Sequence, residues 1–169
     1  MSLNDGLIGV YESTSLNSDL TLGGSAEIYV APDKTLTYGG APIPLGANRL
    51  TFTGSGTLSS TNALVLSEAE SILELRGTNT ISGHVSLNEG KILVYESTSL
   101  NLDLSLGGPS SIFLADGKTL TYGGAALSLG ANTLGITGSG TLSNINALVL
   151  SEAESILELR GTNTISGTV

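Results

Sequence analysis

Short alternations of apolar and polar residues recur along the whole chain. The clearest is an apolar–x–apolar triplet, which begins at Met1, Leu20, Ile43, Leu64, Val85, Leu104, Leu127 and Leu148. The spacing between successive triplets is uneven, and the last four triplets repeat the spacing of the first four. Alternation of period two over a few residues is typical of a β-strand with one buried face.

Two further short segments follow each triplet. The first is another apolar alternation, at 8–10, 28–30, 50–52, 73–75, 92–94, 112–114, 134–136 and 157–159. The second places one aliphatic residue between hydroxyl or Asn side chains, at 15–17, 35–37, 57–59, 80–82, 99–101, 119–121, 141–143 and 164–166. The pattern therefore predicts an all-β fold, a single-stranded parallel β-helix (β-solenoid) of about eight rungs of about 21 residues, in which a rung is one turn of the coil.

The chain also repeats over a longer period that spans four rungs. Residues 62–83 return unchanged at 146–167, and 62 of the 84 aligned positions are identical. Internal repeats of this kind indicate a solenoid or an array. We therefore expect two continuous solenoid units of four rungs each, 1–84 and 85–169. Because Met1 and Val169 both align with Val85, we interpret the chain as a fragment of a longer array.

An antiparallel sandwich of two domains, one for each long repeat, is the alternative fold. It requires hairpins with tight Asn-Gly or Asp-Gly loops. Only Asp5-Gly6 and Asp116-Gly117 qualify, whereas the rung pattern holds in all eight positions. The solenoid is therefore favoured.

Composition narrows the range of functions. Apolar residues make up 40% of the chain but aromatics only 4%, which predicts a thin, regular core of Leu, Ile and Val. The net charge of −9 argues against a nucleic-acid partner, since phosphate binding requires basic patches. Cysteine is absent, which excludes disulfides and thiolate metal sites. No run approaches the roughly 18 apolar residues of a membrane-spanning helix, so we expect no membrane insertion.

One stretch resembles a known type of repeat. Residues 75–83, followed by 85–90 and 92–94, are similar to the strand repeats of bacterial autotransporter passengers and, more loosely, to haemagglutinin-like repetitive surface proteins. The Tyr that is common in the family's Asn-Thr-Tyr motif is Ile81 here, and Ile165 in the second copy. The resemblance implies a right-handed β-helical stalk, an extracellular or bacterial cell-surface location and a role in adhesion. It implies no catalytic residues.

Acidic residues are the obvious candidates for chemistry. Glu68, Glu70 and Glu74 lie close together with Arg76, and the set recurs in the second copy. Paired carboxylates can cleave glycosides. The first two are more simply interpreted as a solvated corner, with Glu74 pointing outward beside Arg76. An active site is also not expected in duplicate, so we predict no enzyme activity, no metal and no cofactor. The single histidine, His84, is interpreted as a surface turn position.

The third segment of each rung yields a candidate surface, the hydroxyl face. If its aliphatic residue faces inward, the neighbours on either side face outward, and stacking aligns them in two ranks about 4.8 Å apart along the rod. Such ranks could order water or sugar, or they could simply stabilise the stack. The candidate residues are Thr35, Thr37, Thr57, Ser59, Thr80, Ser82, Thr119, Thr121, Thr141, Ser143, Thr164 and Ser166.

The sequence thus favours a structural stalk segment of a large repetitive surface protein. The alternative is a binding module that uses the hydroxyl face for ice or polysaccharide. The expected partners are adjacent repeats of a parent protein, other copies through end-to-end association, and a host or cell-surface glycan or protein.

Overall fold

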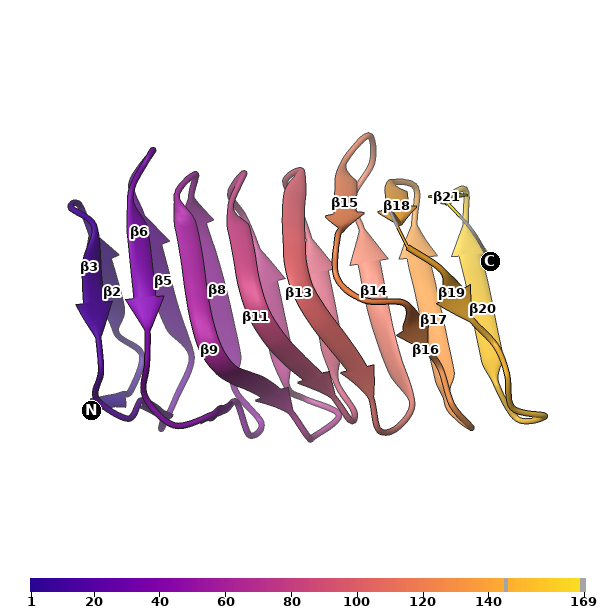
Figure 1. Cartoon of the computed structure of the whole chain (residues 1–169), viewed down its shortest axis with the longest axis horizontal. Helices are drawn as coiled ribbons and strands as arrows, with labels where there is room; N and C mark the ends of the chain where they lie inside the picture. Colours follow the sequence, from indigo (N-terminus) through magenta and orange to yellow (C-terminus); the bar gives the residue numbers. More distant parts are fainter. Residues whose placement is uncertain (145, 168–169) are drawn as a thin grey trace.

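The protein is a β-solenoid whose rungs stack along one axis (Figure 1). A computed structural model describes residues 1–144 and 146–167. These residues form 21 strands and no helix, and every strand pairing among them is parallel. The coil makes about seven turns, with successive strands about 22 residues apart. The predicted fold class is confirmed.

One wall of the coil is an eight-stranded sheet, built from the second alternating segment of each rung. Leu73 pairs with Leu50 on one side and with Ile92 on the other, so aliphatic side chains stack on one another through the core. In stacking order the strands are β2 (Leu7–Val10), β5 (Ala26–Val30), β8 (Arg49–Gly54), β10 (Ile72–Leu75), β12 (Lys91–Val94), β14 (Ser110–Leu114), β17 (Thr133–Gly138) and β20 (Ile156–Gly161).

A second sheet carries the hydroxyl-flanked segments. Its strands are β3 (Thr14–Leu16), β6 (Thr35–Tyr38), β9 (Thr57–Leu66), β11 (Thr80–Leu87), β13 (Thr98–Leu106), β15 (Thr119–Tyr122), β18 (Thr141–Asn144) and β21 (Thr164–Ser166), with β7 (Ile43–Pro44) pairing beside β9. Two small sheets pair β1 (Ser2–Leu3) with β4 (Thr21–Leu22), and β16 (Leu127–Ser128) with β19 (Leu148–Val149).

The structure joins strands that the sequence separates. In β9, β11 and β13 the hydroxyl-flanked segment runs on into the apolar triplet of the next rung as one long strand. The boundary at residue 84 between the two expected units therefore lies inside β11. Pairing of β11 with both β9 and β13 makes the stack continuous across that boundary.

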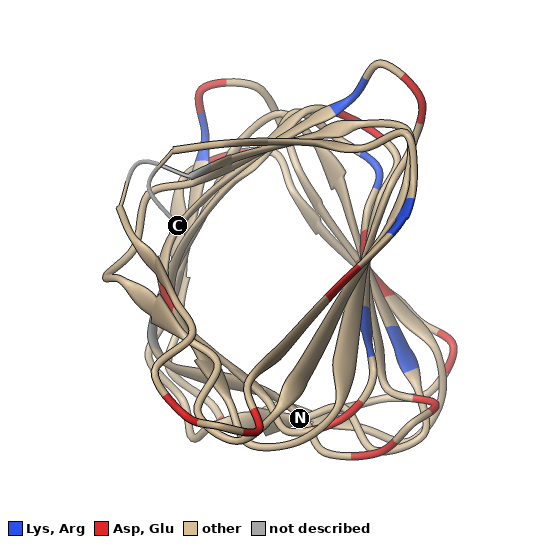
Figure 2. Cartoon of the chain, turned by 90° about the vertical axis from the view of Figure 1, so that its right-hand side faces the viewer, with Lys and Arg blue, Asp and Glu red and all other residues tan. Residues whose placement is uncertain are grey.

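The interior of the coil is aliphatic, and the charged residues lie in its wall and at its corners (Figure 2). Leu50, Leu73, Ile92 and Leu134 are fully buried at the centre of the eight-stranded sheet. Alternation alone accounts for this arrangement, because neighbouring side chains in a strand point to opposite faces. Each short strand is stable only because the rungs above and below cover it.

Two tyrosines adjust the register of the second sheet. Leu16 pairs with Tyr38, and Leu100 pairs with Tyr122, so each pairing is shifted by two positions from the alignment that the sequence pattern predicts. Both phenols are buried. The Tyr38 hydroxyl accepts the Leu20 amide at 3.1 Å, and the Tyr122 hydroxyl accepts the Leu104 amide at 3.2 Å. The shift thus places each phenol where it pairs a backbone amide of the preceding rung.

Gly138, the last residue of β17, should not tolerate a side chain. It has φ of +97°, and an added Cβ would lie 2.1 Å from the Leu114 carbonyl oxygen. Gly117 is the matched control: its φ is +66°, but nothing lies within 4 Å of an added Cβ. We expect Gly117→Ala to cost only the left-handed strain of roughly 1–2 kcal/mol, and Gly138→Ala clearly more. Urea unfolding would measure both; equal losses would contradict this account.

Candidate functional site

The hydroxyl face forms one unbroken row across seven consecutive strands of the second sheet. In the observed register each member pairs with the next: Thr35, Thr57, Thr80, Ser99, Thr121, Ser143 and Ser166. The aliphatic neighbours that face inward, such as Leu58 and Ile81, are buried. The row therefore lies on the outer surface with a repeat of about 4.8 Å, the ordinary strand spacing.

The prediction of two continuous ranks is wrong in register. Ser99 in β13 pairs with Thr121 in β15 and not with Thr119. From β15 onward the row is therefore formed by the residue after the central aliphatic residue, and no longer by the one before it. Two shorter rows flank it on opposite sides. One consists of Ser15, Thr37, Ser59, Ser82 and Asn101, and the other of Thr119, Thr141 and Thr164. All twelve predicted residues lie in these three rows.

Most of the long row is half-buried, and Ser166 at its end is exposed. Cross-strand hydroxyl pairs of this kind stabilise a sheet modestly. A flat array of donors and acceptors at a fixed spacing can also hydrogen-bond water or sugar hydroxyls.

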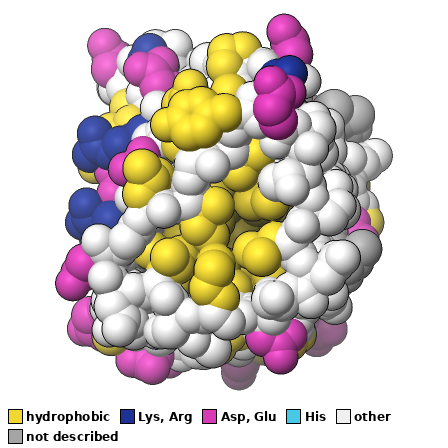
Figure 3. Space-filling model, turned by 90° about the vertical axis from the view of Figure 1, so that its left-hand side faces the viewer, with side chains coloured by type: hydrophobic (Ala, Val, Ile, Leu, Met, Phe, Trp, Pro, Cys, Tyr) yellow, Lys and Arg dark blue, Asp and Glu magenta, His cyan; other side chains and the backbone are white. Residues whose placement is uncertain are grey.

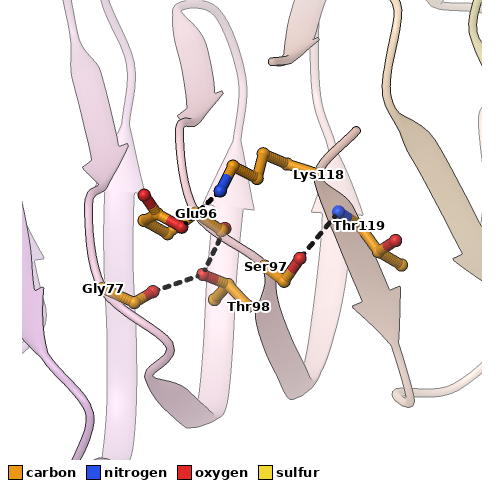
Figure 4. A network of polar contacts seen from close by, with 6 residues as sticks. All are labelled: Gly77, Glu96, Ser97, Thr98, Lys118 and Thr119. Atoms are coloured by element: carbon orange, nitrogen blue, oxygen red, sulfur yellow. Dashed lines mark hydrogen bonds and ion pairs between the residues drawn. The ribbon is translucent and has the colours of Figure 1, made fainter. Parts of the chain in front are cut away.

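A polar network links three rungs at one corner of the coil (Figure 4). Lys118 forms an ion pair with Glu96 at 2.7 Å, and the Thr119 amide donates to the Ser97 hydroxyl at 3.1 Å. The Thr98 hydroxyl contacts the carbonyl oxygens of Gly77 at 2.8 Å and Glu96 at 3.0 Å. These contacts fasten the corner where the chain passes from the first sheet into the second.

The first repeat has the same corner. Lys34 pairs with Glu12 at 2.9 Å, and the Thr35 amide donates to the Ser13 hydroxyl at 3.1 Å. A hydrogen bond from the Lys34 ammonium to the Glu12 carboxylate, with the charge of that carboxylate, raises the pKa of Lys34. The corner is therefore a structural unit of the repeat, and its opposite charges lie on adjacent rungs.

The acidic cluster separates into exposed and buried members. Glu68 and Glu70 are exposed at a turn, as the sequence predicts. Glu74 is only 1% exposed. Arg76 pairs with it as predicted, and Arg49 from the preceding rung lies 2.9 Å from its second carboxylate oxygen. Arg49 was not foreseen, because only the strand register brings it beside Glu74.

The identical cluster in the second copy has a different environment. The side chain of Glu158 is 43% exposed and pairs with Arg160 at 3.0 Å. Thr133 occupies the position of Arg49, and among the described residues no rung follows β20 to cover it. In both copies the glutamate and the neighbouring arginine therefore form an ion pair on the sheet surface. How deeply the glutamate is buried depends on whether another rung follows.

Aromatic side chains pair on the outer face of the eight-stranded sheet, which the sequence analysis missed. The ring centroids of Tyr11 and Tyr29 are 5.5 Å apart, and those of Tyr95 and Phe113 are 5.6 Å apart. The Arg76 guanidinium lies 4.6 Å from the Tyr95 ring centroid. The available signal was alternation: Tyr29 and Phe113 each stand between two inward-facing aliphatic residues.

Two carboxylates and two phenols accept hydrogen bonds from backbone amides. Asp19 accepts the Ala41 amide and Asp103 accepts the Ala125 amide, each at 2.9 Å, across one rung. Burial raises the pKa of the Tyr122 phenol, the Leu104 amide lowers it, and the charge of Asp103 raises it further. These side chains pair amides at places where the second sheet is interrupted.

The remaining candidates carry no site. His84 lies within β11 and contacts the Ser105 hydroxyl at 3.1 Å, so its assignment to a turn is wrong.

The described residues hold no group of three or more His, Asp or Glu side chains that could bind a metal. Nor do they include a helix long and apolar enough to cross a membrane. Two interior gaps of about 10 Å³ each are too small for a ligand; aliphatic side chains and a tyrosine line both, and Ser60 also lines one of them.

Comparison with known proteins agrees with the resemblance. The chain is 28% identical over 156 residues to the adhesin BmaC autotransporter of Brucella suis biovar 1 (strain 1330). The match covers 85% of this chain and 4% of that adhesin. No family model and no solved structure matches. The chain is thus similar to a small part of a very long autotransporter adhesin, and its solenoid fold fits a passenger-type repeat.

The two glutamates offer a matched test of how much burial matters. Glu74→Gln leaves two guanidiniums around a neutral amide, whereas Glu158→Gln alters an exposed pair worth about 0–1 kcal/mol. Because both arginines are about half-exposed, we expect Glu74→Gln to lose about 1–2 kcal/mol more than Glu158→Gln, less than a fully buried pair would lose. Urea unfolding checks this; equal effects would show that Glu74 gains nothing from its burial.

Proposed function

We propose that this chain is a rod segment of a large, repetitive bacterial surface adhesin, and that it holds an adhesive region away from the cell without catalysis. The observation that supports this most directly is the junction between the two repeats. There β10 pairs with β12 in the same unshifted parallel manner as strands within a repeat, with Leu73 beside Ile92 and Leu75 beside Val94. Units joined in this way can be added without changing the fold.

The similarity to the Brucella adhesin supports the surface location. That protein is named as an autotransporter adhesin, and this chain matches only a short part of its length. A short, repeated portion of a long adhesin suits a spacer better than a receptor-binding tip. Adjacent repeats are then the immediate partners, and recognition of a host glycan or protein belongs to other parts of the parent protein.

The rod function can be tested by display on bacteria. One, two or three tandem copies of residues 1–168 would be placed between an outer-membrane anchor and a peptide epitope. Since each copy adds eight strands to the first sheet, the epitope should move outward by roughly 38 Å per copy, measured by electron cryotomography of antibody-labelled cells. Adherence to host cells should not increase with copy number.

Two outcomes would contradict the rod proposal. An epitope height that does not change with copy number would rule out a stiff spacer. Adherence that rises with copy number in the absence of any tip would show that the segment itself is adhesive. A disordered spacer of equal length is the control, because its reach grows only with about the square root of its length.

A binding module is the second candidate function. The observation that favours it is the unbroken hydroxyl row, whose seven members pair in register on consecutive strands. Its ligand would be ice or a polysaccharide. The half-burial of most members and the broken flanking rows favour the rod.

Thermal hysteresis distinguishes the two candidates for ice. We expect no freezing gap from the purified chain, compared with an unrelated acidic protein of similar size. If a gap with shaped crystals appears, Thr121→Val in the long row should change it more than Thr119→Val in a flanking row. Such a result would replace the rod by an active ice-binding face.

A further inference from the structure

The positively charged residues of this acidic chain gather on one surface, the outer face of the eight-stranded sheet. Leu50, Leu73 and Ile92 face the core, so the residues beside them in each strand face outward. Four of the six Lys and Arg residues lie on this face, and only three of the 15 Asp and Glu residues do: Arg49, Arg76, Lys91 and Arg160, against Glu27, Glu74 and Glu158. Figure 3 shows a group of dark blue side chains on one flank of the coil. The face is therefore positive on a chain whose net charge is −9.

The charges at the centre of this face are not balanced. Arg49 and Arg76 share the single carboxylate of Glu74, yet their side chains are 46% and 52% exposed. Lys91 is exposed and forms no ion pair with any described residue, unlike every other Lys and Arg of the chain. The contact of Arg76 with Glu74 uses Nε, which leaves the donors on its two terminal nitrogens for other acceptors. Two guanidiniums and one ammonium therefore face one buried carboxylate.

Apolar side chains lie between these cations. Lys91, Leu93 and Tyr95 project from the same side of β12 and the residue after it, over about 13 Å. In β14, Phe113 pairs with Leu93, and Ser111 pairs with Lys91. The rings of Tyr95 and Phe113 are half-buried, and the Arg76 guanidinium lies over Tyr95. We call this surface the basic aromatic strip, and its members are Arg76, Lys91, Leu93, Tyr95, Ser111 and Phe113.

An open groove of about 440 Å³ borders the basic aromatic strip at Lys91 and Ser111, with Glu89 among its other lining residues. The first repeat forms the matching groove, of about 360 Å³. There Leu7 and Glu27 stand in place of Lys91 and Ser111. The groove of the first repeat is thus lined by carboxylates and no cation, whereas the groove at β12 and β14 offers an unpaired ammonium.

We propose that the basic aromatic strip binds an acidic polysaccharide whose sugars carry carboxylate groups. The forked donors of Arg76 match the two oxygens of a carboxylate, and Lys91 attracts a second carboxylate farther along the sugar chain. Leu93, Tyr95 and Phe113 contact the C–H faces of the sugar rings between them, because the electron-rich face of an aromatic ring attracts weakly positive hydrogens.

A sugar polymer fits the charge distribution better than a nucleic acid does. Duplex DNA carries one negative charge per roughly 1.7 Å of its axis. Of the 15 Asp and Glu residues, the twelve that lie outside this face would repel such a polymer, and only two lysines lie among them. A carboxylated polysaccharide carries no more than one charge for each sugar, which the few cations of the strip can match.

The source of the polysaccharide is inferred from the proposed rod function and depends on it. A rod that stands on a bacterial surface is surrounded along its side walls by the polysaccharides of that surface. Recognition of the host, by contrast, belongs to other parts of the parent protein. The basic aromatic strip lies on a side wall, so we assign its ligand to the cell that carries the rod.

Calorimetric titration tests the ligand chemistry. Hexamannuronate, a hexamer of β-1,4-linked mannuronic acid, should bind the purified chain with a Kd of about 1 mM or tighter, and added salt should weaken the binding. Mannohexaose with the same linkage is the matched control, because it differs only in having a CH₂OH group in place of each carboxylate. It should bind at least about tenfold more weakly.

Lys91→Leu tests the strip itself, and it introduces the residue type that the first repeat has at this position, Leu7. Loss of the unpaired ammonium should weaken hexamannuronate binding about three- to fivefold, as expected for an exposed ion pair. Lys34→Leu is the matched control, since it removes the same charge from a corner of the coil that is not on this face. It should leave the Kd nearly unchanged. Circular dichroism would verify that both variants remain folded.

Nuclear magnetic resonance locates the bound sugar. The chain has two phenylalanines, of which Phe113 lies on the strip and Phe52 is buried in the core. In phenylalanine-labelled protein, hexamannuronate should shift the ring signals of Phe113 and leave those of Phe52 in place. A bound sugar that shifts neither ring would lie elsewhere, such as on the hydroxyl face, and would overturn the proposal.

The proposal is also overturned if hexamannuronate does not bind at about 10 mM, or if mannohexaose binds equally well. Tighter binding of hexathymidylate, the oligonucleotide probe, would assign the strip to nucleic acid instead. Equal effects of Lys91→Leu and Lys34→Leu would show that the charge of the whole chain, and not the strip, attracts the ligand.

These outcomes are separate from those of the rod proposal, because the epitope height in the display experiment does not depend on a ligand. The display experiment also tests the source. If displayed copies adhere to host cells and Lys91→Leu abolishes that adherence, the polysaccharide belongs to the host, and its assignment to the carrying cell is overturned.

Discussion

The structure depends on parallel backbone pairing along the axis of the coil. Each rung forms backbone hydrogen bonds with the rungs on either side of it. The register of these bonds therefore decides which side chains stack in the core and which face solvent. An aliphatic residue beside the same position of the next rung extends the core, as Leu50, Leu73 and Ile92 do. A shift of one residue would reverse every side chain of a strand, so register is the constraint that the sequence must satisfy at each turn.

The sequence predicts the rungs well because alternation is local. The second and third segments of every rung were located from spacing alone, and strands formed at each of them. It did not predict that β9, β11 and β13 join two segments, because that depends on how sharply the corner bends. Nor did it predict the register shift at Tyr38 and Tyr122. That shift follows from a buried phenol pairing an amide one rung away, and no local pattern encodes such a contact.

The candidate site was foreseen in its residues but not in its geometry. The hydroxyl residues do lie on one outer face, yet the register shift turns two predicted ranks into one long row and two short ones. The same limit applies to Glu74, whose pairing with Arg49 requires knowledge of which residues lie side by side in adjacent rungs. Glu158 has the same neighbours in sequence, but Thr133 stands in place of Arg49. Identical sequence therefore does not give identical environment in a solenoid.

A repeat of four dissimilar rungs has a physical advantage over four copies of one rung. The same charged residue then recurs only about 19 Å apart, beyond the Debye length of about 8 Å at physiological ionic strength. In between, the chain can place an opposite charge on the adjacent rung, as Lys118 does for Glu96. An acidic rod can thus lengthen without an unbroken ladder of like charges.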